Sequence, residues 1–416
     1  MIGKGPTQPL VSYVDSMLME IFIEQAGTYK YFMNSDLFIN NQTGYYSVGD
    51  QLFINKYQAL RHATDTHSTV SFHWFDQVFQ NVNVTTLGQK TLNQMYKERA
   101  QQLRDSYDYL ILNYSGGCDS WNILKVFLDN NIHLDQVMVC WPFSAVEAKV
   151  YTPNSADRRV ENFMSEWDFA TKPDLDWLSK NHPEIKIELI DWADPFVHNP
   201  NFVTDKSFDN LNHFHNLADL ARSTVFSKNE ETLTQAGKRV ATIWGLDKPQ
   251  ISLVQNKVVM KFPDSIITVA HPAPCNPKGT EYFYWTPNMP ELAFEMALQT
   301  VNWFRARPDQ QQYMWKEGQG INNMDSELYR VTQQLNQIAA RDGCYTTWVD
   351  KFQVDKPRSA IRYDKDTWLY EHSELKHHVE IWRPLYKDLL ANVSTELRSK
   401  TGYNNISTRA YYVCDF

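Results

Sequence analysis

Cysteine is scarce and scattered in this chain of 416 residues. The sequence contains five cysteines, and no two of them form a CxxC pair. They are Cys118, Cys140, Cys275, Cys344 and Cys414. Their spacing offers no zinc or iron–sulfur ligand set, and an odd, widely separated set is typical of a reducing cytosol.

Long apolar runs are missing as well. No stretch approaches the roughly 20 residues of a membrane-spanning helix, so no membrane partner is expected. The N-terminus has no basic segment followed by an apolar core, and we therefore expect no signal peptide. These absences predict a soluble cytoplasmic protein, located in the host cytoplasm if the chain is viral.

Positive charge is not in excess, because the net charge is −9. This balance argues against broad, sequence-independent nucleic-acid binding, although it leaves room for a local basic groove. Aromatic residues, in contrast, reach 14% of the chain, which indicates large aromatic cores or interfaces rather than disorder.

The length and the hydrophobic patterns predict an α/β fold of three parts. Residues 1–86 are expected to form a small α+β domain, 87–270 a domain with a parallel sheet, and 271–416 a mostly helical region that closes the site. Strands are expected at 70–75, 110–112, 136–143, 185–190 and 239–244, and hairpins at 44–55 and 251–262. Helices are expected at 56–63 and 87–106, then after the loop 115–120 with a stop at Asn130–Asn131, and further at 155–170, 173–182, 213–227, 289–304, 326–340 and 371–397.

The clearest functional signal is the loop Ser115-Gly116-Gly117-Cys118-Asp119-Ser120, which lies between the expected strand at 110–112 and a helix. Two glycines let the backbone turn sharply and approach a ligand closely. The backbone N–H groups and the helix start then favour a bound anion, to which Ser115 and Ser120 add hydroxyl donors. Asp119 beside a phosphate site is explained if it holds Mg²⁺.

This loop is not a Walker A motif, because no Gly-Lys-Ser/Thr ends it. It resembles the PP-loop of the N-type ATP pyrophosphatase superfamily, which includes the synthetase domain of asparagine synthetase. The resemblance implies an adenine nucleotide alpha hydrolase-like domain that splits ATP between its α- and β-phosphates. It also implies that Ser115, Gly116, Gly117, Cys118, Asp119 and Ser120 surround the leaving pyrophosphate.

Two further strand ends carry candidate residues. The stretch RVATIW at 239–244 is followed by a glycine and then by Asp247 and Lys248, an acid and a base suited to Mg²⁺ and phosphate contact. In the resembling family a second polar element faces the loop at this point. Asp119 and Asp247 are therefore the expected metal ligands, and Asp119 and Lys248 the expected catalytic residues. Trp141 is expected either in an adenine pocket or in ordinary core packing.

The chain is also similar to uncharacterised PP-loop proteins of large tailed phages, in phrases such as TKPDLDWLSKNHPEIKIELIDW and EYFYWTPNMPELAFEMA. Asparagine synthetase carries a glutaminase domain with an N-terminal cysteine, but here the chain starts Met1-Ile2-Gly3. The nitrogen donor would then be free ammonia, an amine substrate or a partner protein. The apolar end 410–416 is expected to dock on the body or on a second copy of the chain.

Three functions are weighed. The first is an ATP-dependent, AMP-forming ligase that adenylates a carboxylate or carbonyl oxygen of a small molecule or nucleotide, with an amine or ammonia as nucleophile. The second is a sulfurtransferase or another nucleobase-modifying enzyme, against which the lack of a CxxC pair counts. The third is a non-catalytic nucleotide-binding module, against which the intact Asp119 and both glycines count. The sequence favours the first.

Overall fold

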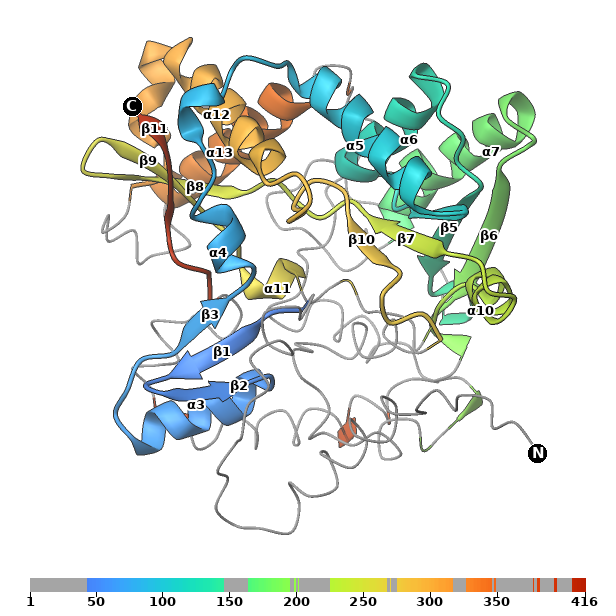
Figure 1. Cartoon of the computed structure of the whole chain (residues 1–416), viewed down its shortest axis with the longest axis horizontal. Helices are drawn as coiled ribbons and strands as arrows, with labels where there is room; N and C mark the ends of the chain where they lie inside the picture. The colour runs from blue at the N-terminus through green and yellow to red at the C-terminus, as the bar shows by residue number, and fades with distance from the viewer. Residues whose placement is uncertain are drawn as a thin grey trace, which may run out of the picture. The chain divides into compact units, whose positions relative to one another are not determined.

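A five-stranded parallel sheet organises the computed structural model of the chain (Figure 1). Its strands are β4 (Tyr109–Asn113), β5 (Gln136–Trp141), β6 (Lys186–Asp191), β7 (Val240–Trp244) and β10 (Thr280–Tyr282). The residues that the structure describes are 43–145, 164–194, 198–199, 201, 225–267, 270, 275–316, 327–345, 348, 377, 380–381, 393–394 and 406–416.

The strand order is β10-β7-β4-β5-β6, and every neighbouring pair is parallel. The chain moves outward from β4 to β5 and β6, and then returns to place β7 on the other side of β4. The order therefore reverses between β4 and β7, which is where open parallel sheets bind ligands at the carboxyl ends of their strands. This confirms the expected α/β class and the four expected strands of the sheet.

The strand β10 was not predicted, because it lies in a region that we expected to be helical after residue 277. Its three residues are too few to show an alternating pattern. They pair with Thr242, Ile243 and Trp244 of β7 and so extend the sheet beyond residue 270.

Three helices lie over the sheet in a row in Figure 1: α5 (Leu92–Ser106), α6 (Cys118–Asp129) and α7 (Lys172–Asn181). The first begins at a capping box in which Thr91 and Gln94 satisfy each other's backbone N–H groups. It starts later than the expected residue 87, after a short turn at Val84–Thr86. Asn131 adopts a positive φ just after α6, as expected for a helix stop.

The remaining described helices are spread over the rest of the chain. They are α3 (Lys56–Asp65), α4 (Asp76–Phe79), the 3₁₀ helix Phe143–Ala145, the π-helix Trp167–Thr171, α10 (Lys228–Gln235), α11 (Asp264–Ile267), α12 (Glu291–Arg305), the 3₁₀ helix Pro308–Tyr313 and α13 (Glu327–Cys344). The long helices α12 and α13 confirm the two predicted at 289–304 and 326–340.

Two smaller antiparallel sheets complete the described fold. The first has the order β2-β1-β3, from β1 (Tyr45–Val48), β2 (Gln51–Phe53) and β3 (Ser71–His73). The second has the order β11-β9-β8, from β8 (Gln250–Val254), β9 (Lys257–Lys261) and β11 (Tyr411–Asp415). Both predicted hairpins are confirmed, and the C-terminal end docks on the body as a strand.

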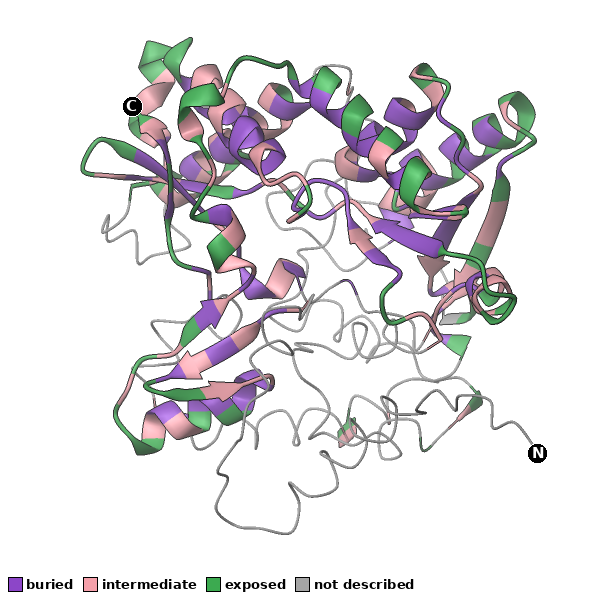
Figure 2. Cartoon of the chain, viewed as in Figure 1, coloured by how far each residue is buried: buried purple, intermediate pink, exposed green. Residues whose placement is uncertain are grey.

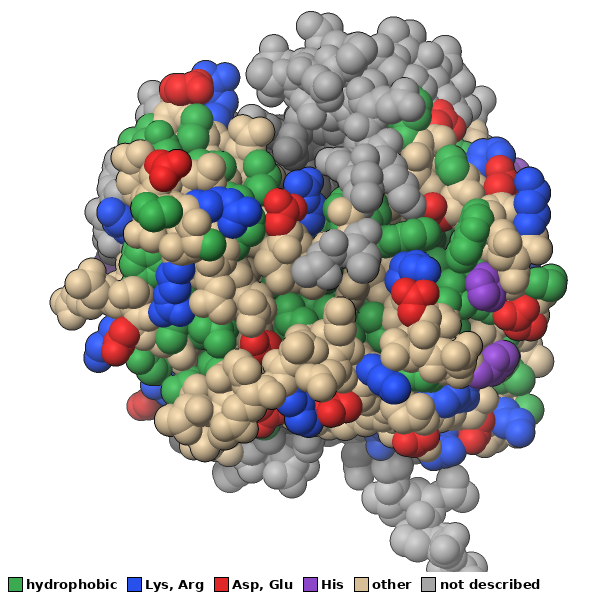
Figure 3. All heavy atoms as spheres, turned by 90° about the horizontal axis from the view of Figure 1, so that it is seen from above, with side chains coloured by type: hydrophobic (Ala, Val, Ile, Leu, Met, Phe, Trp, Pro, Cys, Tyr) green, Lys and Arg blue, Asp and Glu red, His purple; other side chains and the backbone are tan. Residues whose placement is uncertain are grey.

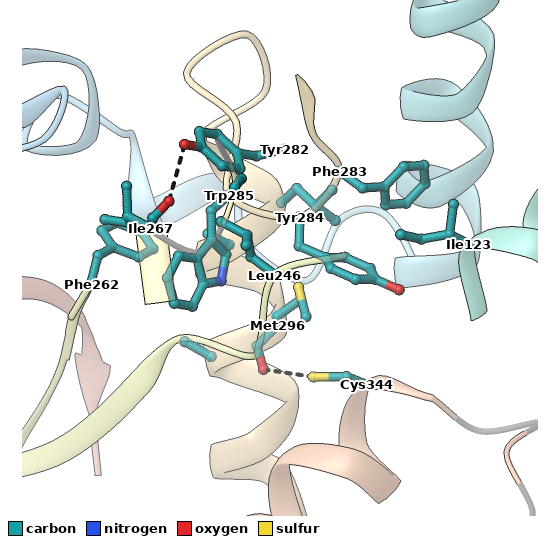
Figure 4. Packing of buried hydrophobic residues seen from close by; sticks show 14 of the residues in the cluster. Ile123, Leu246, Phe262, Ile267, Tyr282, Phe283, Tyr284, Trp285, Met296 and Cys344 are labelled. Atoms are coloured by element: carbon teal, nitrogen blue, oxygen red, sulfur yellow. Dashed lines mark hydrogen bonds between the residues drawn. The ribbon is translucent and has the colours of Figure 1, made fainter. Parts of the chain in front are cut away.

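One large hydrophobic core among the described residues connects the three sheets. Trp74, which follows β3, packs edge-on against Phe262 after β9 and Tyr282 of β10, with ring centroids 5.2 and 5.6 Å away. Figure 4 shows Phe262, Tyr282 and Trp285 gathered in this region. Figure 2 shows the inner strand β7 largely buried and the edge strand β6 mostly half-buried or exposed. The proposed boundaries at residues 86 and 270 remain predictions.

The predicted helices at 155–170, 213–227 and 371–397 lie mostly outside the described residues. Within the described part of the chain, no helix combines the length and the apolar character that a membrane span requires.

Candidate functional site

The loop after β4 turns at a position that only glycine tolerates. Gly116 has φ +77°, and a Cβ built on it would lie 2.6 Å from Oγ1 and 2.8 Å from the backbone N of Thr171. The Thr171 hydroxyl donates a hydrogen bond to the Ser115 carbonyl over 2.7 Å. The loop therefore packs directly against the turn before α7, and any side chain at residue 116 would separate them.

The two serines tie this loop to the start of α6. The N–H of Ser115 donates to the Ser120 hydroxyl over 3.2 Å, and that hydroxyl donates to the Gly117 carbonyl, also over 3.2 Å. Gly117 is the N-cap of α6 and provides no side-chain acceptor for the first turn. Such a helix start, with its dipole and backbone N–H groups, suits an anionic ligand.

The end of β7 crosses the start of α6 at Gly245. A Cβ on Gly245 would lie 2.9 Å from Ile123 Cδ1 and 3.3 Å from the backbone carbon of Asp119. This close approach carries the following residues over the loop. Lys248 Nζ lies 2.8 and 3.1 Å from the two carboxylate oxygens of Asp119 and 3.0 Å from Asp247 Oδ1.

The structure thus brings together most of the residues that the sequence singled out. Asp119 and Lys248 meet across 129 positions of the chain, and Asp247 joins them. The thiol of Cys118 lies 3.6 Å from Lys248 Nζ, inside the same group. The predicted loop residues and the predicted β7 residues form one site, at the point where the strand order reverses.

Trp141 lies at the carboxyl end of β5, in an aromatic group. Its ring is stacked at 6.3 Å from that of Trp167, which also meets Phe143 edge-on at 4.8 Å. The Trp141 indole N–H donates to Met164 Sδ over 2.8 Å. Trp167 begins the turn that ends at Thr171, so this aromatic group adjoins the loop through the contact of Thr171 with Gly116.

Two tyrosines that we did not predict complete the site. The Tyr345 hydroxyl, just after α13, donates to Asp119 Oδ1 over 2.6 Å, and its ring lies 5.3 Å from Lys248 Nζ. The Tyr284 hydroxyl donates to the Asp119 carbonyl over 2.8 Å and accepts from Asn122. Figure 4 shows the Tyr284 ring between Ile123 and Met296.

Electrostatics fix the charge state of these groups. Burial alone would lower the pKa of the Lys248 ammonium, but the charges of Asp119 and Asp247 reverse this and hold that pKa well above its ordinary value. Burial, followed by the charge of Asp119, raises the pKa of the Tyr345 and Tyr284 hydroxyls well above the ordinary range. At neutral pH the site therefore contains a charged lysine and two protonated phenols.

The carboxylates of Asp119 and Asp247 lie where both could bind one Mg²⁺ ion. Asp119 and Asp247 both reach one cationic centre, the Lys248 ammonium, so their oxygens already converge on a common cation position. Among the described residues, no group of three or more His, Cys, Asp or Glu side chains could hold a metal ion. Two carboxylates fit Mg²⁺ when phosphate oxygens and water complete its shell and Lys248 turns toward the phosphates.

On the face seen in Figure 3, acidic and basic side chains of the described residues are interspersed, without a continuous basic patch. Comparison of the chain with models of protein families, with curated proteins and with solved structures gave no match. Fold and site together define a mixed α/β protein with a glycine-containing loop at the switch point of a parallel sheet.

Proposed function

We propose that the chain is a PP-loop enzyme that cleaves ATP to AMP and pyrophosphate and joins an acceptor to ammonia or an amine. The observation that carries this proposal is the contact of Lys248 with Asp119 above the glycine loop. A lysine, two carboxylates and a helix start converge on one place, where a polyphosphate would find its charge neutralised.

Each group has a role in this scheme. The loop backbone, Ser115 and Ser120 bind the β- and γ-phosphates, and Lys248 moves from the carboxylates to the phosphate oxygens. Asp119 and Asp247 would hold Mg²⁺, which supplies charge neutralisation on the pyrophosphate. Tyr345 and Tyr284 fix the position of Asp119. The aromatic group around Trp141 lies where adenine can stack.

The reaction consists of two displacements. A carboxylate or carbonyl oxygen of the acceptor attacks the α-phosphorus, and the bond from that phosphorus to the bridging oxygen of the β-phosphate breaks. Pyrophosphate leaves, carrying the negative charge that the loop and Lys248 neutralise. The nitrogen nucleophile then attacks the adenylated carbon and loses a proton. The bond from that carbon to the acceptor's oxygen breaks, and AMP leaves with this oxygen. The chain acts by positioning and by charge stabilisation.

The site favours a ligase over a sulfurtransferase. Cys118 lies between Asp119 and Lys248, 3.6 Å from an atom of each. A persulfide at Cys118 would occupy the place proposed for pyrophosphate. Its sulfur could not be transferred to the adenylated carbon. The acceptor is a small molecule or nucleotide, and ammonia comes from solution or from a separate donor protein.

Pyrophosphate–ATP exchange tests the first displacement without knowledge of the amine. The full chain is incubated with ATP, Mg²⁺, labelled pyrophosphate and fractions of a metabolite extract. We expect label to enter ATP with the fractions that contain the acceptor, and not with an Asp119→Ala variant. Exchange that is equal in the wild type and in Asp119→Ala would contradict the proposal.

A further inference from the structure

A second group of reactive side chains lies in the β2-β1-β3 sheet, away from the parallel sheet. His73 Nε2 is 2.8 Å from the hydroxyl of Ser47, and His73 Nδ1 is 2.7 Å from Asp76 Oδ2. With its proton on Nδ1, the imidazole donates to the carboxylate and accepts from the serine hydroxyl. This is the order of contacts that makes a serine hydroxyl nucleophilic.

The sequence did not indicate this group. The three residues come from β1, β3 and the start of α4, with no motif between them. The antiparallel pairing of β1 with β3 brings the residues together, because Tyr45 lies opposite His73 and Ser47 opposite Ser71.

These side chains lie on the more open face of the sheet. Along β1, Tyr46 and Val48 are buried against the core, whereas Tyr45 and Ser47 on the other face are half-buried. The His73 and Asp76 side chains are 27% and 19% exposed. A small molecule can therefore approach the serine, while the carboxylate is partly screened from water.

Neighbouring residues hold both Asp76 and the His73 imidazole in place. The second oxygen of Asp76 accepts hydrogen bonds from the Tyr411 hydroxyl over 2.6 Å and from the Trp74 N–H over 3.4 Å. Although burial alone would raise it, hydrogen bonds from His73 and Tyr411 keep the pKa of Asp76 below its ordinary value. The Tyr45 ring stacks on the imidazole, with centroids 4.9 Å apart and planes at 19°. The network is thus preorganised in one geometry.

We propose that Ser47 is a nucleophile for acyl transfer, with His73 as its general base and Asp76 as a positioning residue. The Ser47 oxygen attacks an acyl carbon while its proton passes to His73 Nε2. The ester bond of the substrate then breaks, and the leaving alcohol takes the proton from His73. Water hydrolyses the acyl-serine by the same route, so no oxidant or other co-reactant is needed.

The substrate class follows from where the serine lies. Ser47 is in the middle strand of a sheet, paired with Leu52 on one side and Ser71 on the other. Its backbone is engaged in the ladder, unlike that of a serine at a sharp turn whose neighbouring N–H groups can stabilise an oxyanion. We therefore expect reaction with activated esters, such as small aryl esters, and with the reactive phosphorus of fluorophosphonates, rather than with peptide bonds.

The test is covalent labelling of the full chain with a fluorophosphonate, read by peptide mass spectrometry. Ser71 is a matched internal control, because it is an exposed serine directly opposite Ser47. We expect Ser47 to be labelled and Ser71 not, and His73→Gln to slow labelling by about 100-fold or more. Labelling of the two serines at equal rates, or no labelling of Ser47, would overturn the proposal.

Two variants distinguish a positioning role of Asp76 from a purely structural role. Asp76→Asn should slow labelling and remove the far-downfield proton signal of the His73–Asp76 hydrogen bond. Tyr412→Phe, one residue after Tyr411, removes an exposed hydroxyl that contacts Asp415 and should leave the labelling rate within about 2-fold. Equal losses in Asp76→Asn and Tyr412→Phe would overturn the positioning role of Asp76. This site does not depend on the proposed ATP chemistry, and either can fail alone.

Discussion

Lys248 Nζ lies 2.8 Å from Asp119 Oδ1 and 3.1 Å from Asp119 Oδ2, so one ammonium group bridges both oxygens of a carboxylate on another strand–helix unit. The two residues follow β7 and β4, the strands between which the sheet order reverses. Their contact places a base and an acid over a glycine loop, and it is the feature from which the proposed function is built.

Replacement of the loop carboxylate should remove ATP cleavage. We expect Asp119→Ala to lower the rate by at least about 100-fold, because it removes a metal ligand and the partner of Lys248. The fold should persist, since Asp119 is a partly exposed side chain. Asp129→Ala, at the other end of α6 and paired with Lys125 at the surface, is the matched control. Steady-state assays and circular dichroism would show both effects, and full activity of Asp119→Ala would exclude Asp119 from the mechanism.

The loop glycine can be compared with a glycine of the same conformation elsewhere. Gly116 and Gly237 have φ +77° and +78°, but a Cβ at Gly237 would meet nothing within 4 Å. Gly237→Ala should cost only the left-handed strain of about 1 kcal/mol. Gly116→Ala should cost more and should also weaken ATP binding, because the loop must move away from Thr171. Denaturant unfolding and calorimetric titration with ATP would measure the two effects. Equal free energies of unfolding and equal ATP affinities of Gly116→Ala and Gly237→Ala would contradict this account.

Tyr345 should act through Asp119 and not through its own chemistry. Tyr345→Phe keeps the ring beside Lys248 but removes the hydrogen bond to Asp119. Loss of such a supporting contact typically weakens metal binding by 10–100-fold, so we expect the Mg²⁺ concentration for half-maximal activity to rise by about that factor. Tyr109→Phe removes a tyrosine hydroxyl that contacts Gln136 at the other end of β4. This control should not change the Mg²⁺ concentration for half-maximal activity.

Stability should respond to pH through Glu230. This residue is only 2% exposed, and burial raises the pKa of its carboxyl group. The Glu188 charge adds to this rise, and the hydrogen bond from Asn276 opposes it. A carboxyl whose pKa is higher in the folded than in the unfolded protein does not lower the free energy of unfolding below the unfolded-state pKa of about 4.3. It lowers that free energy as the pH rises through the folded-state pKa. Glu230→Gln should therefore raise the melting temperature at pH 7 but not near pH 4, and Glu231→Gln, one residue along, should not. A gain for Glu230→Gln that is equal at both pH values would argue against this coupling.

Much of the sheet and half of the site follow from local patterns. Leu110, Ile111 and Leu112 are fully buried, as their apolar run predicts. Gly116 and Asp119 could be predicted as loop residues because they lie close together in the sequence. Asp247 and Lys248 could be placed because parallel strands end at one edge of a sheet.

The rest depends on contacts that no local pattern encodes. Tyr345 reaches Asp119 from 226 residues away, and its own neighbourhood looks like the end of an ordinary helix. The Ser47–His73 contact arises from strand pairing, which single residues do not specify. Strand β10 was missed because three residues show no periodicity.

The most direct measurement is the product of ATP turnover. The full chain is incubated with ATP labelled at the α-phosphate, Mg²⁺, ammonia and the acceptor fraction found by exchange, and the products are separated by chromatography. The account predicts labelled AMP with an equal amount of pyrophosphate, and neither from Asp119→Ala. Labelled ADP with inorganic phosphate would contradict cleavage between the α- and β-phosphates and would overturn the proposed function.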